Sequence, residues 1–319
     1  MRLIRTLPPN RTPTGPTALV IGNFDGCHLG HQALIERMHA FANSEQLAPA
    51  LMCFEPLPAT FFRPDKPVRR LMSVRDKIST LRRLGIEYLF MLPFQSALSQ
   101  MEPEAFVSEI LVAGAHARHI IVGEDFRFGH RASGDVALLQ ALGRQHGFEV
   151  HSVSAVRVFG ERVSSTRIRE ALARGDLETA EAFLGRPYSL SGRVLRGRQL
   201  GRQLGYATTN LRPPNPPALS GIFAVRVCAE NSDDPKHHPG VASLGQRPTV
   251  NGRDWLLEVH LFDYDGHLYG QHLTVEFIGF IRSEEKFESL EAMTEEMHRD
   301  ARKAREVLSG ALRFKEEMR

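Results

Sequence analysis

The hydrophobic pattern of this chain changes once, near residues 185–188, and this change constrains the fold more than any other feature. Before it, short apolar segments such as residues 18–21 and 50–54 alternate with stretches such as 74–84, where apolar residues recur at helical spacing. Strands that alternate with helices form a parallel sheet covered by helices. We therefore expect a doubly wound α/β domain over residues 1–185.

After this change, short alternating segments are separated by Gly, Pro, Asn and Asp, as at residues 221–228, 255–262 and 273–280. Such a pattern is typical of antiparallel sheets, and we expect a small β-barrel. From Ser289 onward apolar residues return at helical intervals, which predicts a C-terminal helix. The second domain is thus expected over residues 186–319.

Size and composition fit a globular protein with two cores. The chain has 319 residues, of which 42% are hydrophobic and 24% charged, and no segment approaches the roughly 18 consecutive apolar residues of a membrane helix. The N-terminus lacks the apolar region of a secretory signal. Cys27, Cys53 and Cys228 are widely spaced without a CxxC pair, which argues against disulfides or a zinc knuckle. We expect a cytoplasmic protein without a membrane partner.

The net charge of +3 does not distinguish between a nucleic acid and an anionic small molecule as partner. An anionic small molecule needs only a local cluster of Arg and His. The oligomeric state is left open by the sequence.

The first candidate site is the string GNFDGCHLGH at residues 22–31, which follows the first strand and opens the first helix. Ligands bind at this edge of a parallel sheet, glycines let a phosphate approach, and the unpaired N–H groups of the helix start point at it. A plain turn with two surface histidines is the alternative. The position on a strand-to-helix turn favours a phosphate site formed by Gly22, Asn23, Asp25, Gly26, His28, Gly30 and His31.

The second candidate is VSSTRIR at residues 163–169, at the start of a helix that runs to Ala173. Hydroxyls at a helix start are usually only N-caps. Arg167 and Arg169, however, place cations where they oppose the helix dipole, and a bound anion would remove this conflict.

These segments resemble motifs of known enzymes. HLGH at residues 28–31 resembles the HxGH signature of the nucleotidyltransferase superfamily, and GNFDGCHLGH looks like its FAD synthetase branch. VSSTRIR resembles an ISSTxIR-type motif that contacts ATP phosphates, which implies roles for Ser164, Ser165, Thr166 and Arg169. GEDFRFG at residues 123–129 is similar to a G-x-D-F-x-F-G segment and implies flavin and adenylyl contacts, with Asp125 assigned to the site and the phenylalanines to the core.

Adenylyl transfer suits such residues. The attacking FMN phosphate is already ionised, so no strong base is needed. The enzyme must hold two anions together and neutralise charge that grows on the α-phosphate and on the leaving pyrophosphate, a task for histidines and backbone amides.

The second domain begins with a glycine-rich basic run, GRVLRGRQLGRQLGYATTN, at residues 192–210. Alone, such a run is often a solvated or nucleic-acid-binding loop. Thr208 and Asn210 lie two residues apart, so in extended backbone both can offer hard oxygens to Mg²⁺ from one face. The run resembles the riboflavin kinase pattern G-x-V-x-x-G-x-x-x-G-R-x-L-G-x-P-T-A-N, with Ala207 for Pro and Thr209 for Ala, and the resemblance implies nucleotide contacts from Gly192, Gly197 and Gly201.

A carboxylate stands on a mostly apolar strand in LEVHLFD, at residues 257–263. Alternation puts Glu258 and His260 on the face opposite Leu257, and a buried carboxylate needs a reason. A salt bridge or an edge position could supply it. Phosphorylation of a neutral alcohol needs a proton acceptor, for which Glu258 is the best candidate, and the segment resembles a riboflavin kinase LEVHLxD segment with its base at this residue.

Residues 281–287, IRSEEKF, also look like a riboflavin kinase segment, which implies flavin contacts from Arg282 and Glu285. Together the resemblances imply a bacterial bifunctional riboflavin kinase/FAD synthetase that uses Mg²⁺ and takes ATP, riboflavin and FMN as substrates. No nucleic-acid partner is expected.

Two other functions stay open at this point. One is an adenylyltransferase for another phosphorylated metabolite, such as a pantetheine or nicotinamide mononucleotide, with a regulatory barrel. The other is a nucleic-acid-binding protein that uses the basic loop at residues 193–202. Thr208, Asn210 and Glu258 argue against a passive barrel.

Overall fold

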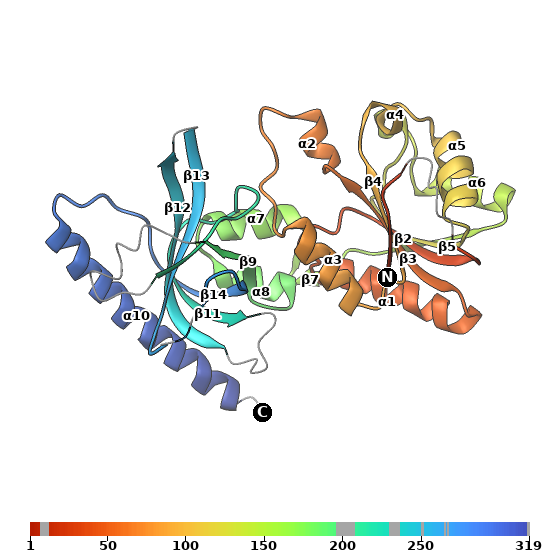
Figure 1. The fold of residues 1–319 in the computed structure, drawn as a ribbon. Coiled ribbons are helices and arrows are strands. Elements are labelled where there is room, and N and C mark those ends of the chain that lie inside the picture. Colours follow the sequence, from red (N-terminus) through yellow and green to blue (C-terminus); the bar gives the residue numbers. More distant parts are fainter. Residues whose placement is uncertain are drawn as a thin grey trace. The chain divides into compact units, whose positions relative to one another are not determined.

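The computed structural model describes residues 1–6, 13–195, 208–229, 237–249, 252–264, 266 and 268–317. The chain divides into two compact units (Figure 1). The first comprises Met1–Val68 and Val74–Ser164, and the second comprises Arg69–Ser73 and Ser165–Arg319. The expected fold class, a doubly wound α/β domain and an antiparallel barrel with a terminal helix, is confirmed.

The first unit is built on a six-stranded sheet in which every neighbouring pair of strands is parallel. From β2 the chain adds β3 and β4 on one side, where β1 forms the edge, and then returns to add β5 and β6 on the other side, so the order reverses between β2 and β5. Ligands bind outside the carboxyl ends of the strands at such a switch point. The strands, in spatial order, are β1 (Arg2–Ile4), β4 (Tyr88–Pro93), β3 (Ala48–Glu55), β2 (Thr17–Ile21), β5 (Ala117–Gly123) and β6 (Glu149–Val153).

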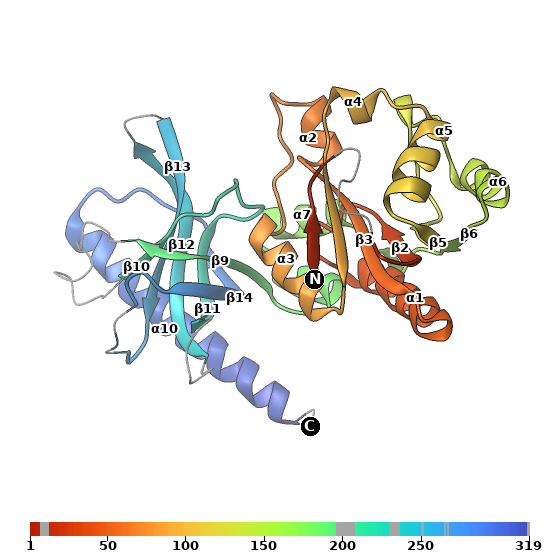
Figure 2. The same ribbon diagram turned by 45° about the vertical axis from the view of Figure 1, so that its right-hand side comes forward.

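Helices cover both faces of this sheet (Figure 2). Leu19 and Ile21 belong to a core cluster that contains Phe106 and Leu139, whereas Ala18 and Val20 point to the opposite face, where α1 packs against β2, β3 and β5. The helices are α1 (Leu29–Glu45), α2 (Pro58–Phe62), α3 (Val74–Arg83), α4 (Ser96–Ser99), α5 (Pro103–Ala105), the π-helix η1 (Phe106–Gly114), the 3₁₀-helix η2 (His130–Ala132) and α6 (Val136–His146). A small hairpin of β7 (Arg157–Val158) and β8 (Glu161–Arg162) follows.

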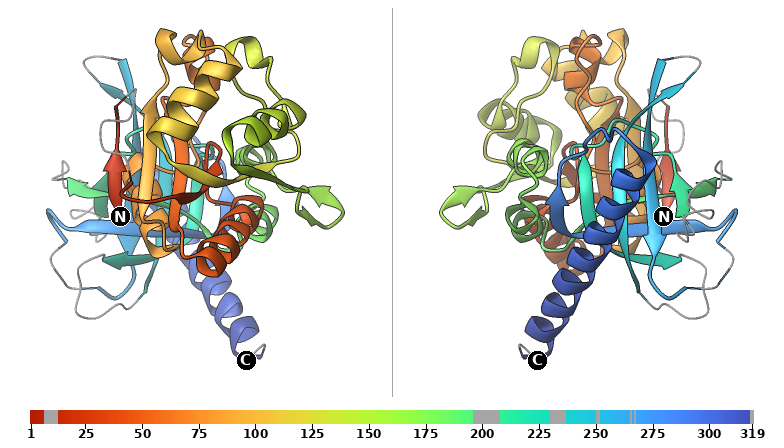
Figure 3. Two further views of the ribbon diagram at one scale, coloured as in Figure 1. Left: turned by 90° about the vertical axis from the view of Figure 1, so that its right-hand side faces the viewer. Right: turned by 90° about the vertical axis from the view of Figure 1, so that its left-hand side faces the viewer.

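The second unit is a closed antiparallel barrel that is preceded by two helices, α7 (Ser165–Ala173) and α8 (Leu177–Leu184). The long helix α10 (Leu290–Glu317) packs against β11, β12 and β14, where Ala304 and Leu308 contribute to a buried cluster with Ala224 and Phe262 (Figure 3). In barrel order the strands are β10 (Thr208–Leu211), β13 (Gly252–Leu261), β12 (His238–Thr249), β11 (Gly221–Ala229), β14 (His272–Arg282) and β9 (Tyr188–Leu195).

The compact units divide at Ser164 and Ser165, earlier than the domain boundary expected near residues 185–188. Helix α8 packs against β9 and β14 and ends at Gly185, whose φ of 72° forms a left-handed cap. The expected boundary stays a prediction. No helix in the described part of the chain is long and apolar enough to cross a membrane.

Candidate active sites in the two units

The turn after β2 has an unusual backbone. Phe24, Gly26 and Cys27 have φ values of 49°, 90° and 44°, and both Phe24 and Cys27 are buried. Left-handed backbone is costly for side chains with a Cβ and is often found at functional sites. A Cβ on Gly22 would lie 3.1 Å from the Phe24 ring, which is tighter than most such contacts, so a larger residue here would press on that ring. The predicted phosphate loop is therefore a tightly folded element at the switch point of the sheet.

Two stacked histidines open helix α1. His28 is the N-cap, and its Nδ1 accepts a hydrogen bond from the backbone N–H of His31 at 3.3 Å. The two rings stack with centroids 3.6 Å apart. A Cβ on Gly30 would lie 3.2 Å from the His28 ring, so a larger residue here would press on that ring.

His31 is electrostatically unlike an ordinary surface histidine. Burial, His28 and Lys77 lower the pKa of His31 well below its usual value of 6.5, so the ring is neutral at neutral pH. Its buried Nδ1 has no hydrogen-bond partner among the described residues. A bound ligand could supply that partner.

Lys77 is a residue of this site that the sequence reasoning missed. It extends from α3, is only 1% exposed, and donates a hydrogen bond from Nζ to the carbonyl oxygen of Asn23 at 2.8 Å. Lys77 and Leu81 are the two buried residues of α3 and are one helical turn apart. That spacing was the available signal, because it places Lys77 on the apolar face of its helix.

Asp125 lies just beyond the carboxyl end of β5, the strand next to β2. Its Oδ2 accepts a hydrogen bond from Arg162 at 2.6 Å, and both side chains are exposed. Phe128 is buried, and Phe126 packs against the same core, as the sequence interpretation held. Asp125 is thus at the expected edge of the sheet, but a salt bridge engages its carboxylate.

The predicted helix start at VSSTRIR is confirmed, because α7 begins at Ser165. The motif spans the division of the chain, with Ser164 in the first unit and residues 165–169 in the second. Arg167 forms an ion pair with Glu170 at 3.0 Å, and Arg169 donates from Nε to the carbonyl oxygen of Arg69 at 2.7 Å. The charge conflict at this helix start is therefore partly relieved within the protein. Thr166 is exposed.

In the barrel, β10 pairs with β13 so that Asn210 lies opposite Glu258. The Oδ1 atom of Asn210 is buried without a hydrogen-bond partner among the described residues. Gly192 is in β9, and a Cβ there would lie 3.4 Å from Leu211. Gly197, Gly201 and the side chain of Thr208 lie outside the described residues.

Glu258 is half-buried in β13, between the buried Leu257 and Val259, so the predicted alternation is confirmed. Arg247 donates to Glu258 Oε2 at 3.1 Å and to Glu284 Oε1 at 2.6 Å. A salt bridge, one of the two alternative explanations for a carboxylate on this strand, is thus present. Arg247 and Glu284 were not predicted as partners, because the sequence does not show that Arg247 on β12 reaches Glu258 on the paired strand β13 or that Glu284, just after β14, reaches Arg247.

Arg282, a predicted flavin contact, is engaged within the protein. Its guanidinium donates to both oxygens of Asp300 at 2.9 and 2.7 Å, lies 3.5 Å from Glu296 and stacks over Phe287. This bidentate pair joins β14 to α10. Glu285 is exposed. Flavin contacts from these two residues stay predictions.

The fold and the two clusters fit one class, a nucleotide-handling enzyme with a predicted anion-binding turn in its α/β unit and a carboxylate–amide pair in its barrel. Comparison with known proteins agrees. Residues 11–167 match the FAD synthetase family and residues 184–308 match the riboflavin kinase family.

Relatives match over nearly the whole chain. The bifunctional riboflavin kinase/FMN adenylyltransferases of Haemophilus influenzae and Escherichia coli (strain K12) are each 39% identical to it over 96% of this chain and cover 98% and 97% of their own length. That of Pseudomonas fluorescens is 40% identical over 96% of this chain and 97% of its own. The chain belongs to the family of bifunctional riboflavin kinase/FMN adenylyltransferases.

Among solved structures, one described as the crystal structure of a macrolide-efflux protein from Streptococcus pneumoniae matches with a TM-score of 0.77 and 27% sequence identity. The match covers 90% of this chain and 93% of the chain in that structure. The similarity extends through both units.

Proposed function

We propose that the two activities of the family are divided between the two units of this chain. It is an enzyme that phosphorylates riboflavin to FMN and adenylylates FMN to FAD, with ATP as the second substrate of both reactions. The barrel carries the kinase reaction and the α/β unit the adenylyl transfer. The observation that supports this division best is Asn210, whose unpartnered Oδ1 lies on the strand position opposite Glu258.

In the kinase reaction, Glu258 accepts the proton of the riboflavin hydroxyl as that oxygen bonds to the γ-phosphorus of ATP. The bond from the γ-phosphorus to the bridging oxygen breaks, and ADP leaves. Arg247 holds the Glu258 carboxylate through one N–H and Glu284 through another, which fixes the direction of the proton acceptor.

The residues of the barrel fit Mg²⁺, which this reaction class uses with ATP. Asn210 offers a hard amide oxygen that has no competing partner in the described residues, and Thr208 precedes it by two positions on the same strand. The ion would neutralise charge on the transferred and leaving phosphates. We assign Asn210 and Thr208 to it.

In the adenylyl transfer, an FMN phosphate oxygen attacks the α-phosphorus of ATP, the bond to the β-phosphate oxygen breaks, and pyrophosphate leaves. The backbone of residues 22–28 and the first N–H groups of α1 present donors to these anions. His28 and His31 stand at the same helix start, and neutral His31 retains a ring nitrogen for a phosphate contact. Buried Lys77 holds the turn in place, because its Nζ donates a hydrogen bond to the carbonyl oxygen of Asn23.

We place the enzyme in the cytoplasm. The sequence has three widely spaced cysteines without a CxxC pair, and Cys27 and Cys53 are buried, which suits a reducing compartment. Its partners are the small-molecule substrates.

The test separates the two reactions by mutation. Glu258→Gln keeps size and one acceptor oxygen but cannot take a proton near neutral pH, so FMN formation should fall by about 10²–10⁴ while FAD synthesis from supplied FMN continues. His28→Ala should slow FAD synthesis on the order of 100-fold and leave FMN formation intact. Both products are measured by chromatography after incubation with ATP and Mg²⁺. Loss of both activities in either variant would contradict the division.

A further inference from the structure

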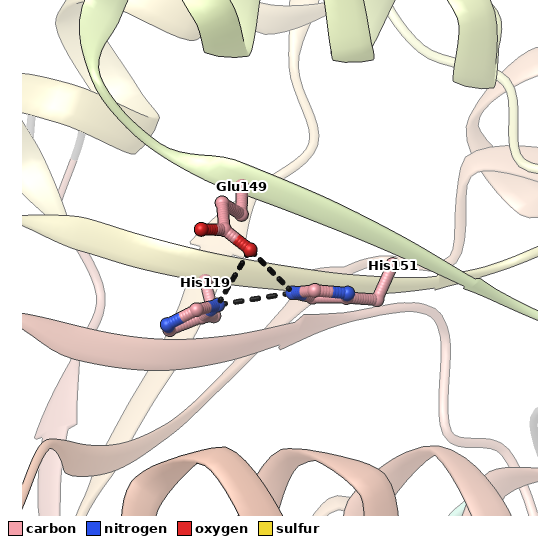
Figure 4. A group of neighbouring side chains, drawn as sticks. All are labelled: His119, Glu149 and His151. Carbon is pink, nitrogen blue, oxygen red and sulfur yellow. Dashed lines mark hydrogen bonds and ion pairs between the residues drawn. The ribbon is translucent and has the colours of Figure 1, made fainter. Parts of the chain in front are cut away.

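A second cluster of ionisable side chains lies in the α/β unit, away from the phosphate loop. His119 is in β5, and Glu149 and His151 are in the neighbouring strand β6 (Figure 4). His119 and Glu149 lie in the amino-terminal halves of their strands and His151 is the middle residue of β6, whereas the phosphate loop follows the carboxyl end of β2. Neither reaction described above uses them.

The three side chains point their ligand atoms at one another. His119 Nδ1 and His151 Nε2 are 3.0 Å apart, and Glu149 Oε2 lies 3.9 Å from the first and 3.7 Å from the second. These separations bracket the edge of roughly 3.3–3.4 Å that a tetrahedron with metal–ligand bonds of about 2.0–2.1 Å has. The two distances to Glu149 are too long for hydrogen bonds, so hydrogen bonding alone does not explain why the carboxylate faces both rings.

A further carboxylate orients the first imidazole. His119 is 2% exposed, and its Nε2 lies 2.8 Å from Glu45 Oε1, at the last residue of α1. With its proton on Nε2, donated to Glu45, His119 presents a lone pair on Nδ1 toward the cluster. A carboxylate on the outer nitrogen of a histidine is the arrangement that holds metal-ligating histidines in place and raises their basicity.

The second imidazole is also held in place by packing. Phe41 stacks on both rings, at 4.6 Å from His119 and 4.0 Å from His151. With His119 in the tautomer described above, its Nδ1 accepts a hydrogen bond from His151 Nε2–H in the metal-free protein. On metal binding that proton moves to His151 Nδ1 and Nε2 becomes a ligand.

We propose that His119, His151 and Glu149 form a binding site for a divalent transition metal of the Zn²⁺ type, with Glu45 as the carboxylate that orients His119. Two imidazoles and one carboxylate are a donor set that suits Zn²⁺ and disfavours Mg²⁺, which prefers oxygen ligands. The ion joins β5 to β6 and, through Glu45, to the C-terminal end of α1.

The proposed ion is structural. Helix α1 begins after His28 and ends at Glu45, which separates the cluster from the histidines of the phosphate loop by about 25 Å along the helix. It therefore does not contact the reacting phosphates. By fixing the far end of α1 to the sheet, it stabilises the helix whose first turn carries His28 and His31.

The test measures metal binding by the full-length chain that has been stripped with a chelator, in excess Mg²⁺ so that oxygen sites are filled. We expect one Zn²⁺ per chain, and Co²⁺ in its place should give the intense visible absorption of a tetrahedral nitrogen-bound ion. Glu149→Gln changes an exposed side chain and is not expected to disturb folding. Both Glu149→Gln and His151→Gln should weaken Zn²⁺ binding at least tenfold.

His130→Gln is the matched control, because His130 forms a comparable pair with Glu102, at 3.2 Å, away from the cluster. Zn²⁺ should raise the unfolding midpoint of the wild type and of His130→Gln, but not of the two cluster variants. Wild-type protein that binds no Zn²⁺, or cluster variants that bind it as tightly as His130→Gln does, would overturn the proposal.

Discussion

His31 and Asn210 each bury a polar side-chain atom that no described residue satisfies, and each was a predicted site residue. An unsatisfied buried polar atom costs about 1–3 kcal/mol. Such a cost is offset when a ligand supplies the missing partner, and this is why unpaired atoms at these two positions support substrate contacts. Glu258 and Asp125, by contrast, already have arginine partners.

The lowered pKa of His31 predicts a pH dependence of stability. The unfolded chain protonates this ring near pH 6.5, whereas the folded protein resists protonation until a lower pH. Below pH 6.5 the unfolded state therefore binds more protons, and stability falls as pH decreases through the window between the two pKa values. In His31→Gln the free energy of unfolding should decline less steeply with decreasing pH between about pH 7 and 5. The difference in slope should be at most the slope that one additional proton bound by the unfolded state produces. Denaturant titrations at several pH values measure it, and parallel curves would contradict the prediction.

Arg247→Met tests whether the ion pair with Glu258 orients the proton acceptor. We expect FMN formation to fall on the order of 10- to 100-fold, because the carboxylate loses its fixed direction, while FAD synthesis from FMN is unchanged. Arg212→Met is the control, since Arg212 forms only an exposed pair with Asp254 in the same barrel. Equal kinase rates in the two variants would show that Arg247 does not orient Glu258 and contributes to the fold alone.

At the scale of elements, the sequence predicted the long helices and strands well. The spacing of Leu34, Met38 and Phe41 predicted α1, and the alternation of residues 255–262 predicted β13. The β7–β8 hairpin and the short helices α2 and α4 were not predicted, because two to five residues give too little periodicity to recognise.

Contacts between distant segments also could not be predicted from the sequence. Lys77 is 54 residues from Asn23, and Arg247 is 37 from Glu284. Hydrophobic patterns place such side chains on a face of their own element but do not say which other segment that face meets. The motifs could be placed on their elements, whereas the partners of the motif residues required the fold.

Lys77→Met tests the contribution of α3 to the phosphate loop. Methionine fills similar space without charge, so packing is retained, but the Asn23 carbonyl loses its donor. We expect FAD synthesis to fall at least tenfold, because a loosened turn no longer presents its amides to the phosphates. Lys66→Met, at an exposed position of the same unit, is the control. Wild-type FAD synthesis by Lys77→Met would show that the turn keeps its shape without this contact.

At the scale of the whole molecule, the contacts and the hydrophobic pattern place the main division of the chain at different residues. Apart from Arg69–Ser73, the second compact unit begins at Ser165, whereas the pattern changes near residues 185–188 and the two family matches leave out residues 168–183. Helices α7 and α8 occupy this interval. Phe183 and Leu184 of α8 are 1% exposed, and α8 packs against β9 and β14.

Two fragments distinguish these boundaries, one of residues 186–319 and one of residues 165–319. Both contain the complete barrel and the predicted kinase residues, so both should make FMN from riboflavin. The longer one should be more stable, because it keeps Phe183 and Leu184 buried and each such side chain contributes about 1.5–3 kcal/mol. Urea unfolding of the two fragments measures the difference, and riboflavin phosphorylation reports the site. Equal stability would place the boundary near residue 186, as the sequence predicted. If neither fragment folds, the barrel is not an independent domain, and the kinase site depends on the α/β unit.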